Sequence, residues 1–156
     1  MGPALGRANQ KLYHAAILTR LLSAERAREQ VPLAVLLDAI GVPARQHLLD
    51  AYGWLLVALV DPAELPQDPP GDMAALVAAY GLSEPLRGEL VELRQLEATG
   101  WLGELVSASV TPGAAASPVN SELSLVARAW DDGQLEEWRR QLEDLIDRLS
   151  HGLDEW

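Results

Sequence analysis

The sequence PARQHLLDAYGWLLVALV, residues 43–60, decides the fold of this chain, because every residue after Asp50 in it is apolar, aromatic or glycine. A helix that is hydrophobic on all sides is stable only when other helices enclose it. The uncharged part has about ten residues, whereas a membrane span needs roughly 20. We therefore predict the central helix of a folded core, started by Pro43, stopped by Asp61-Pro62 and carrying His47 and Asp50 as a polar strip.

The composition of the whole chain favours helices around that segment. Leu and Ala supply 52 of the 156 residues, whereas Val, Ile and Thr together supply 17. Leu and Ala are strong helix formers, while β-branched residues favour strands. Because a chain of this length closes a single core, we predict one domain over residues 1–156 with an all-α fold, an antiparallel bundle of about five to six helices.

Periodicity and breaker residues predict the other elements. Helices are expected from Asn9 as N-cap to about Glu29, from Pro32 to Gly41, from Met73 to Tyr80 after Asp72, from Ser83 to Gly100, briefly after Trp101, and after Asp132-Gly133. Proline-rich residues 61–71 and residues 111–120 predict exposed loops. Residues 121–129 alternate apolar and polar side chains, which favours a short extended segment.

Charge and cysteine content exclude several classes of function. The net charge is −11, made up of +2 in residues 1–60 and −13 in residues 61–156, so we expect no nucleic-acid partner. The chain has no cysteine, which excludes disulfides, thiolate metal sites and a cysteine nucleophile. The first 20 residues lack an apolar export signal. We predict a cytoplasmic protein that is not bound to a membrane.

The residue types needed for catalysis do not occur at useful spacings. The residues three positions before the three histidines are Lys11, Ala44 and Arg148, so the Glu-x-x-His pattern of bundle metal sites is absent. No glycine run precedes the single lysine, Lys11, as a phosphate cradle requires, and no Gly-x-Ser-x-Gly occurs. We therefore predict no catalytic, cofactor-binding or metal-binding residue, and a protein that is not an enzyme.

The run Arg7-Ala8-Asn9-Gln10-Lys11-Leu12-Tyr13, the Leu/Ala-rich region after it and the charged last helix ending at Glu155-Trp156 form a recognisable combination. It resembles a group of small acidic gammaproteobacterial proteins that carry a domain of unknown function. The resemblance implies a compact bacterial cytosolic protein, and it carries no activity, cofactor or catalytic residue.

The residues at the start of this run allow two interpretations. In the first, Asn9 caps a helix whose Leu12 and Tyr13 enter the core. In the second, Asn9, Lys11, Tyr13 and His14 line a small polar pocket at the end of the bundle.

Three hypotheses on function follow from these patterns. The first is a helical protein that acts through protein–protein interaction or homo-oligomerisation, with Trp138, Trp156, Leu142 and Leu149 as the candidate interface, since tryptophan often anchors interfaces. The second is a binder of a small apolar ligand in a cavity near Tyr13, Tyr52 and Trp54. The third uses Arg7 and His14, whose spacing resembles the Arg-x(4–6)-His motif of HEPN ribonucleases.

Overall fold

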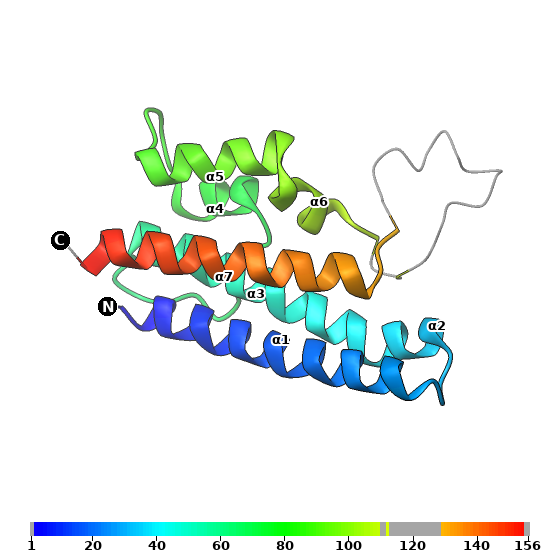
Figure 1. Cartoon of the computed structure of the whole chain (residues 1–156). Helices are drawn as coiled ribbons and strands as arrows, with labels where there is room; N and C mark the ends of the chain where they lie inside the picture. The colour runs from blue at the N-terminus through cyan, green and yellow to red at the C-terminus, as the bar shows by residue number, and fades with distance from the viewer. Residues whose placement is uncertain (1, 110–111, 113–128, 155–156) are drawn as a thin grey trace.

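The computed structural model describes residues 2–109, 112 and 129–154, and all regular elements in this part of the chain are helical (Figure 1). The elements are α1 (Pro3–Arg28), α2 (Leu33–Leu36), the π-helical turn η1 (Leu37–Gly41), α3 (Val42–Val60), α4 (Met73–Tyr80), α5 (Gly88–Thr99), α6 (Trp101–Ser107) and α7 (Asp132–Asp154). The predicted all-α class is confirmed. The predicted loop at 111–120 and extended segment at 121–129 lie outside the described residues, apart from Pro112 and Ala129.

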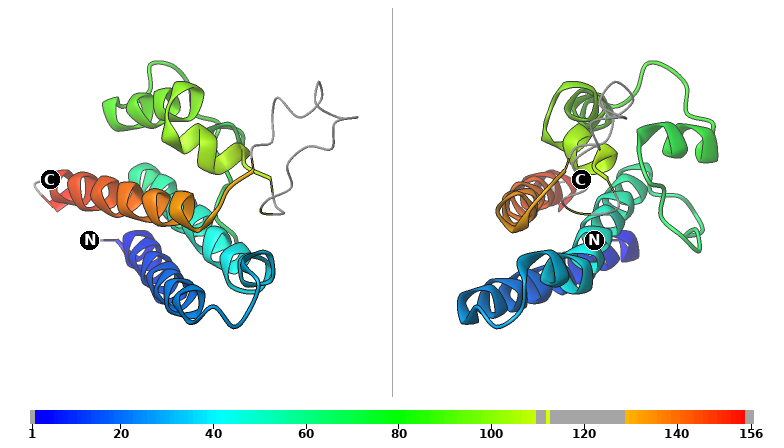
Figure 2. Two further views of the ribbon diagram at one scale, coloured as in Figure 1. Left: turned by 45° about the vertical axis from the view of Figure 1, so that its right-hand side comes forward. Right: turned by 90° about the vertical axis from the view of Figure 1, so that its right-hand side faces the viewer.

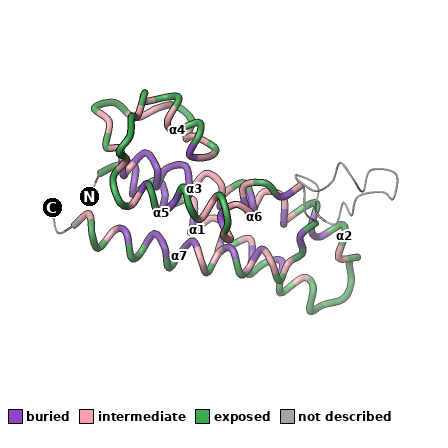
Figure 3. The backbone as a smooth tube through the Cα atoms, turned by 90° about the horizontal axis from the view of Figure 1, so that it is seen from above, coloured by how far each residue is buried: buried purple, intermediate pink, exposed green. Residues whose placement is uncertain are grey.

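Helix α3 lies at the centre of the bundle, as its sequence predicts. Helices α1 and α7 pack along it, and α4, α5 and α6 cover its remaining side (Figures 1 and 2). Figure 3 shows the buried positions following α3 and the inner side of α7. The buried residues of α3 are Ala44, Arg45, Leu48, Ala51, Tyr52, Gly53, Trp54, Leu55, Leu56, Val57 and Leu59.

The first helix is longer than predicted, because it begins at Pro3 rather than at Asn9. Proline is well suited to the first turn of a helix, where its missing N–H has no partner to lose. Asn9 is therefore an exposed residue inside the helix and caps nothing. The inner face of α1 packs against α3, and its buried residues are Ala4, Leu5, Ala8, Leu12, Ala15, Thr19 and Leu22.

The expected break at Gly41 is wrong, since the backbone runs from α2 through η1 into α3 without leaving a helical conformation. Gly41 is buried, and a Cβ at this position would lie 3.3 Å from the Trp130 ring. The glycine therefore permits a close contact instead of ending a helix. The π-helical turn inserts the extra residue that joins the two predicted segments.

The later elements agree with the sequence except at the start of α5. The Asp72 carboxylate accepts a hydrogen bond of 2.8 Å from the Ala75 amide and so caps α4. Gly81, with φ of 57°, ends α4 in the left-handed conformation. Helix α5 begins at Gly88 and not at Ser83, and the Arg87 side chain just before it donates a 2.9 Å hydrogen bond to the Leu59 carbonyl.

Gly53 allows the proline-rich segment 61–71 to lie against α3. A Cβ on this residue would lie 2.3 Å from the Pro70 carbonyl oxygen and 2.8 Å from the Cβ of Pro69. Only glycine fits this approach without moving the backbone. The segment is therefore held against α3 at Pro69 and Pro70, Leu65 also packs against the core, and most of its other positions are exposed.

Gly53→Ala is expected to lower the free energy of unfolding by about 1–3 kcal/mol, because the added methyl group overlaps the Pro70 carbonyl. Gly6→Ala is the matched control, since Gly6 lies in α1 with nothing within 4 Å of its Cβ position. That variant should be more stable by about 0.5–1 kcal/mol, the helix propensity difference between the two residues. Urea unfolding followed by circular dichroism measures both, and a stabilised Gly53→Ala would contradict the packing described here.

Candidate functional site

A row of polar contacts runs along one edge of the α1–α3 interface. The Arg7 guanidinium carbon lies 4.7 Å from the centre of the Trp54 ring. One turn further along α1, Lys11 Nζ lies 3.9 Å from Asp50 Oδ2. The last pair consists of His14 and His47, whose rings meet edge to face with centroids 5.2 Å apart. Because these pairs follow each other in opposite directions along the two helices, they fix the antiparallel register of α1 on α3.

His47 is held neutral by its surroundings in this row. Its Nδ1 atom is buried and has no hydrogen-bond partner in the described part of the chain. Burial lowers the pKa of His47, and the positive charge of Lys11 and the neighbouring His14 lower it further, while Asp50 acts weakly in the opposite sense. Asp50 is itself oriented by a 2.9 Å hydrogen bond from the Gln46 side chain.

The predicted polar pocket at Asn9, Lys11, Tyr13 and His14 is only half formed. Lys11 and His14 join the row and are partly buried, whereas Asn9 and Tyr13 lie on the outside of α1. Tyr13 is 60 % exposed, so the prediction that it enters the core was wrong. Successive helical residues are about 100° apart, and the burial of Leu12 therefore turns Tyr13 away from α3.

The residues predicted to form an interface pack inside the chain itself. Trp138, Leu142 and Leu149 are 2 %, 0 % and 6 % exposed. The centroids of the Trp138 and Trp130 rings are 6.1 Å apart. Their 3,4 spacing forms a seam as predicted, but the seam docks on α1 and α3 rather than on a partner. Trp156 lies outside the described residues.

Two polar side chains, one buried and one half-buried, brace the bundle from within. The Arg45 guanidinium donates hydrogen bonds of 2.9 and 3.1 Å to the carbonyls of Leu105 and Ala108, at the C-terminal end of α6. Burial lowers the pKa of Arg45, but its positive charge offsets the negative end of the helix dipole. The sequence contains no local signal for this contact, because its partners are backbone atoms about 60 residues away.

Glu97 of α5 links α3 to its neighbours on another side, as Arg45 links α3 to the end of α6. Its carboxylate accepts hydrogen bonds from the Tyr52 hydroxyl and, at 2.9 Å, from the Met73 amide. Burial raises the pKa of Glu97, and burial together with the nearby carboxylate raises the pKa of Tyr52. Sequence reasoning missed this pair as well. The arrangement joins α3, α4 and α5 and so has a structural role.

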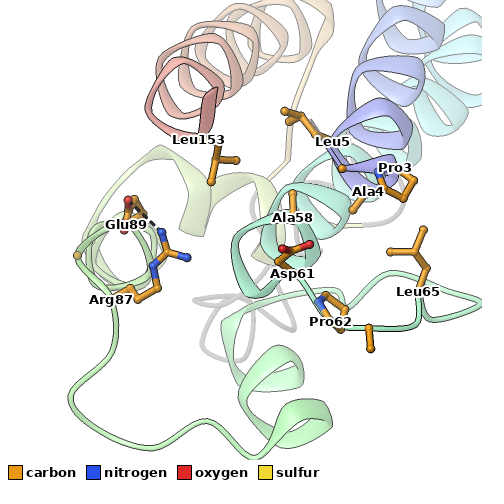
Figure 4. Close-up of a pocket in the computed structure, with 13 residues that line it drawn as sticks. Pro3, Ala4, Leu5, Ala58, Asp61, Pro62, Leu65, Arg87, Glu89 and Leu153 are labelled. Carbon is orange, nitrogen blue, oxygen red and sulfur yellow. Dashed lines mark hydrogen bonds and ion pairs between the residues drawn. The ribbon is translucent and has the colours of Figure 1, made fainter. Parts of the chain in front are cut away.

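A cleft of about 910 Å³ opens where α1 begins and where α3 and α7 end (Figure 4). Its apolar lining comes from Pro3, Ala4, Leu5, Ala58, Pro62, Ala63, Leu65 and Leu153, and its charged lining from Asp61, Arg87 and Glu89. The sequence placed an apolar cavity near Tyr13, Tyr52 and Trp54 instead. Tyr52 and Trp54 are packed in the core at 0 % and 4 % exposure, so the cleft lies at the end of the bundle and not between its middle turns.

The large apolar side chains that face solvent are concentrated in the first helix and the residues that follow it. Six such residues are exposed in the described part of the chain, and five of them belong to α1 or to the segment that follows it. These five are Tyr13, Ile17, Leu21, Val31 and Val35. Tyr13, Ile17 and Leu21 are one helical turn apart and form a continuous stripe on the side of α1 opposite α3, which we call the outer stripe.

Metal binding and membrane insertion find no support in the described residues. They contain no group of three or more His, Asp or Glu residues arranged to hold a metal ion. None of the helices in the same part of the chain is long and apolar enough to cross a bilayer. The cleft and the outer stripe remain candidate binding surfaces.

Comparison with known proteins gives a family but no activity. A family model described as a family of unknown function (DUF6586) matches residues 1–156. Neither the curated proteins nor the solved structures contain a match to this chain.

The lowered pKa of His47 predicts how stability depends on pH. The unfolded chain protonates this residue near its ordinary pKa of 6.5, whereas the folded chain binds the proton only at lower pH. Neutral His47 therefore makes its full contribution to the free energy of unfolding above pH 6.5, and this contribution is lost progressively as the pH falls below 6.5. His47→Gln, which stays neutral, should lose less stability than the wild type between about pH 7.5 and about pH 5.5.

Urea unfolding at the two pH values measures this difference. Gln95→Ala is the control, because Gln95 is exposed on α5 and its side chain carries no titratable group. It should keep the wild-type dependence on pH. Equal pH dependence in His47→Gln and the wild type would show that His47 is not held neutral.

Proposed function

The chain belongs to this family of unknown function over residues 1–156, and from its geometry we propose that it is a non-enzymatic protein–protein interaction module. Its contact surface in this proposal is the outer stripe of α1. The supporting observation is the concentration of exposed apolar side chains there, since three of the six large exposed ones in the described residues belong to this stripe. Apolar residues scattered singly over a surface are normal, whereas a contiguous patch marks a contact site.

The size of the exposed groups supports the proposal. Tyr13, Ile17 and Leu21 are 60 %, 43 % and 45 % exposed. Full burial of such a side chain is worth about 1.5–3 kcal/mol. A bundle that acts as a monomer would carry polar residues at these positions. A partner that covers the three apolar side chains removes them from water, and this burial makes binding more favourable.

The residues beside the stripe have the character of an interface rim. Arg20 lies next to Leu21, is exposed and forms no ion pair within the described ranges of the chain. Tyrosine and arginine are enriched among residues that dominate binding energy, and both occur here. Because α1 packs along α3, its outer side is already rigid and pays little entropy on binding.

The proposal includes a cytoplasmic location and a partner that is protein rather than nucleic acid. The complete lack of cysteine suits a reducing compartment. The net charge of −11 opposes binding to a polyanion.

A photo-crosslinking amino acid at position 13 should give one discrete crosslinked product in cells that make the protein. The same group at Ala98, an exposed position on α5, is the control and should give none. Adding Ile17→Glu should reduce the product from position 13 about tenfold or more, because it puts a charge into the stripe, and should leave the circular dichroism spectrum unchanged. Identical products from positions 13 and 98, or none from position 13, would refute the proposal.

A second candidate function is the binding of a small apolar ligand in the cleft. The cleft volume of about 910 Å³ lies within the range of ligand sites in proteins, and most of its lining is apolar. Ala58 faces the cleft from α3 (Figure 4). A larger residue there would fill the space without entering the centre of the core.

Native mass spectrometry of freshly purified protein tests this candidate. The wild type should carry a small molecule, and Ala58→Phe should lose it because the ring occupies the cleft. Ala78→Phe is the control, since Ala78 is exposed on α4 and does not line the cleft. A wild-type protein with the bare chain mass would count against ligand binding.

A further inference from the structure

We propose that the outer stripe of α1 binds the same stripe of a second copy of this chain. The two α1 helices run antiparallel, with Ile17 on the two-fold axis. This inference rests on the proposed function, because it names the partner of the same surface. It is carried by the order of apolar and charged residues along the exposed side of α1.

The apolar residues of the stripe are symmetric about Ile17. Tyr13 and Leu21 lie four residues before and after it, and both are exposed. A two-fold axis through Ile17 brings this residue against its own copy and Tyr13 against Leu21 of the second copy. Two-fold interfaces need such a self-complementary patch. The next positions on this side of α1 are Gln10 and Ala24, which lie seven residues before and after Ile17. The two-fold axis places the longer Gln10 side chain of one copy against the small Ala24 of the other.

The position of Ile17 along α1 allows the two helices to overlap for most of their length. Helix α1 runs from Pro3 to Arg28, so Ile17 lies close to its midpoint. The overlap therefore extends over about 33 Å at a rise of 1.5 Å per residue. A contact between one pair of helix faces buries an area at the lower end of the range for protein interfaces. We therefore expect the dimer to have a dissociation constant of about 1–100 μM.

The charges on α1 favour the antiparallel arrangement over the parallel one. Arg7 and Glu25 are 18 residues apart, which is five full helical turns, so they lie on the same side of α1. They are ten residues before and eight residues after Ile17. The two-fold axis brings Arg7, which lies over Trp54 of its own chain, beside Glu25 of the other copy at the edge of the contact. Glu25 also holds Arg28 of its own chain at 3.3 Å. A parallel pair would instead place Arg7 against Arg7.

Arg20 finds a partner in the same arrangement. It lies seven residues after Tyr13, two helical turns along nearly the same line of α1. The two-fold axis places it near Tyr13 of the second copy, where a guanidinium can lie over the aromatic face. In the single chain Arg20 has no ion pair within the residues that the structure describes, so this contact uses a charge that is otherwise unpaired.

The outer side of α7 does not suit a second copy. Its exposed residues include Glu137, Glu143, Asp144 and Asp147, and no large apolar side chain of α7 is exposed in its described part. Arg140 and Arg148 are exposed there as well, so two such faces would bring together charges of both signs and no apolar surface. The outer stripe of α1 lacks acidic residues before Glu25 and carries the apolar groups, so it is the surface on which two copies associate.

The absence of cysteine makes a direct test of the geometry feasible. Ile17→Cys introduces one thiol per chain, and on the two-fold axis the two thiols come within disulfide reach. Tyr13→Cys places its two thiols about 12 Å apart in an antiparallel pair. Under mild oxidation Ile17→Cys should form a covalent dimer at least about tenfold faster than Val91→Cys, the exposed apolar control on α5. A mixture of Tyr13→Cys and Leu21→Cys should form mixed dimers faster than either variant alone.

Light scattering supplies an independent readout. The mean mass of the wild type should rise with concentration toward twice the chain mass over about 1 μM to 1 mM, and Ile17→Glu should keep the single-chain mass with an unchanged circular dichroism spectrum. A wild type that stays monomeric, with equal crosslinking of Ile17→Cys and Val91→Cys, would overturn the dimer. If position 13 then crosslinks a different protein in cells, the proposed function stands and only its partner changes. Crosslinking of Tyr13→Cys as fast as Ile17→Cys would overturn the antiparallel arrangement.

Discussion

Enclosure of α3 is the constraint on which the rest of the structure depends. Eleven of its residues are buried, and they face every direction around the helix axis. Neighbouring helices must therefore approach from all sides, and the small residues Ala44, Ala51 and Gly53 set how closely they come. The proline-rich segment 61–71 takes part in this enclosure, because at Gly53 it is this segment, and not a helix, that covers α3.

The polar residues of α3 determine which helix lies on which side. Arg45 reaches the end of α6, Asp50 reaches Lys11 of α1, and Tyr52 reaches Glu97 of α5. Leucine contacts tolerate sliding and rotation, whereas a buried hydrogen bond is lost when its partner shifts by a turn. The hydrogen bonds of Arg45 and Tyr52 therefore each specify one neighbour and its register. The partly exposed Lys11–Asp50 ion pair, at 3.9 Å, adds a weaker preference, and the leucines supply most of the energy.

The sequence predicts the helices better than it predicts the sides on which they are buried. The central segment and the 3,4 spacing of α7 contain enough apolar residues to identify both elements as core. Helix α1 carries two apolar lines, one through Leu5 and Leu12 and another through Tyr13 and Ile17. Periodicity alone does not decide which line is buried, because that depends on where α3 and α7 lie. Arg45 and Glu97 were missed for a related reason, since their partners are distant in sequence.

The exposed line on α1 follows from the way in which the bundle closes. Helix α1 contacts α3 along one side and α7 along the next, and these contacts complete the enclosure of the central helix. The remaining side of α1 contributes nothing to the enclosure, so the stability of the monomer places no demand on the residues there. Tyr13, Ile17 and Leu21 nevertheless occupy it, at positions where polar residues would serve solubility better. In the proposed interaction these side chains are covered by the partner, and a helix that already faces outward allows that contact without any change in the fold.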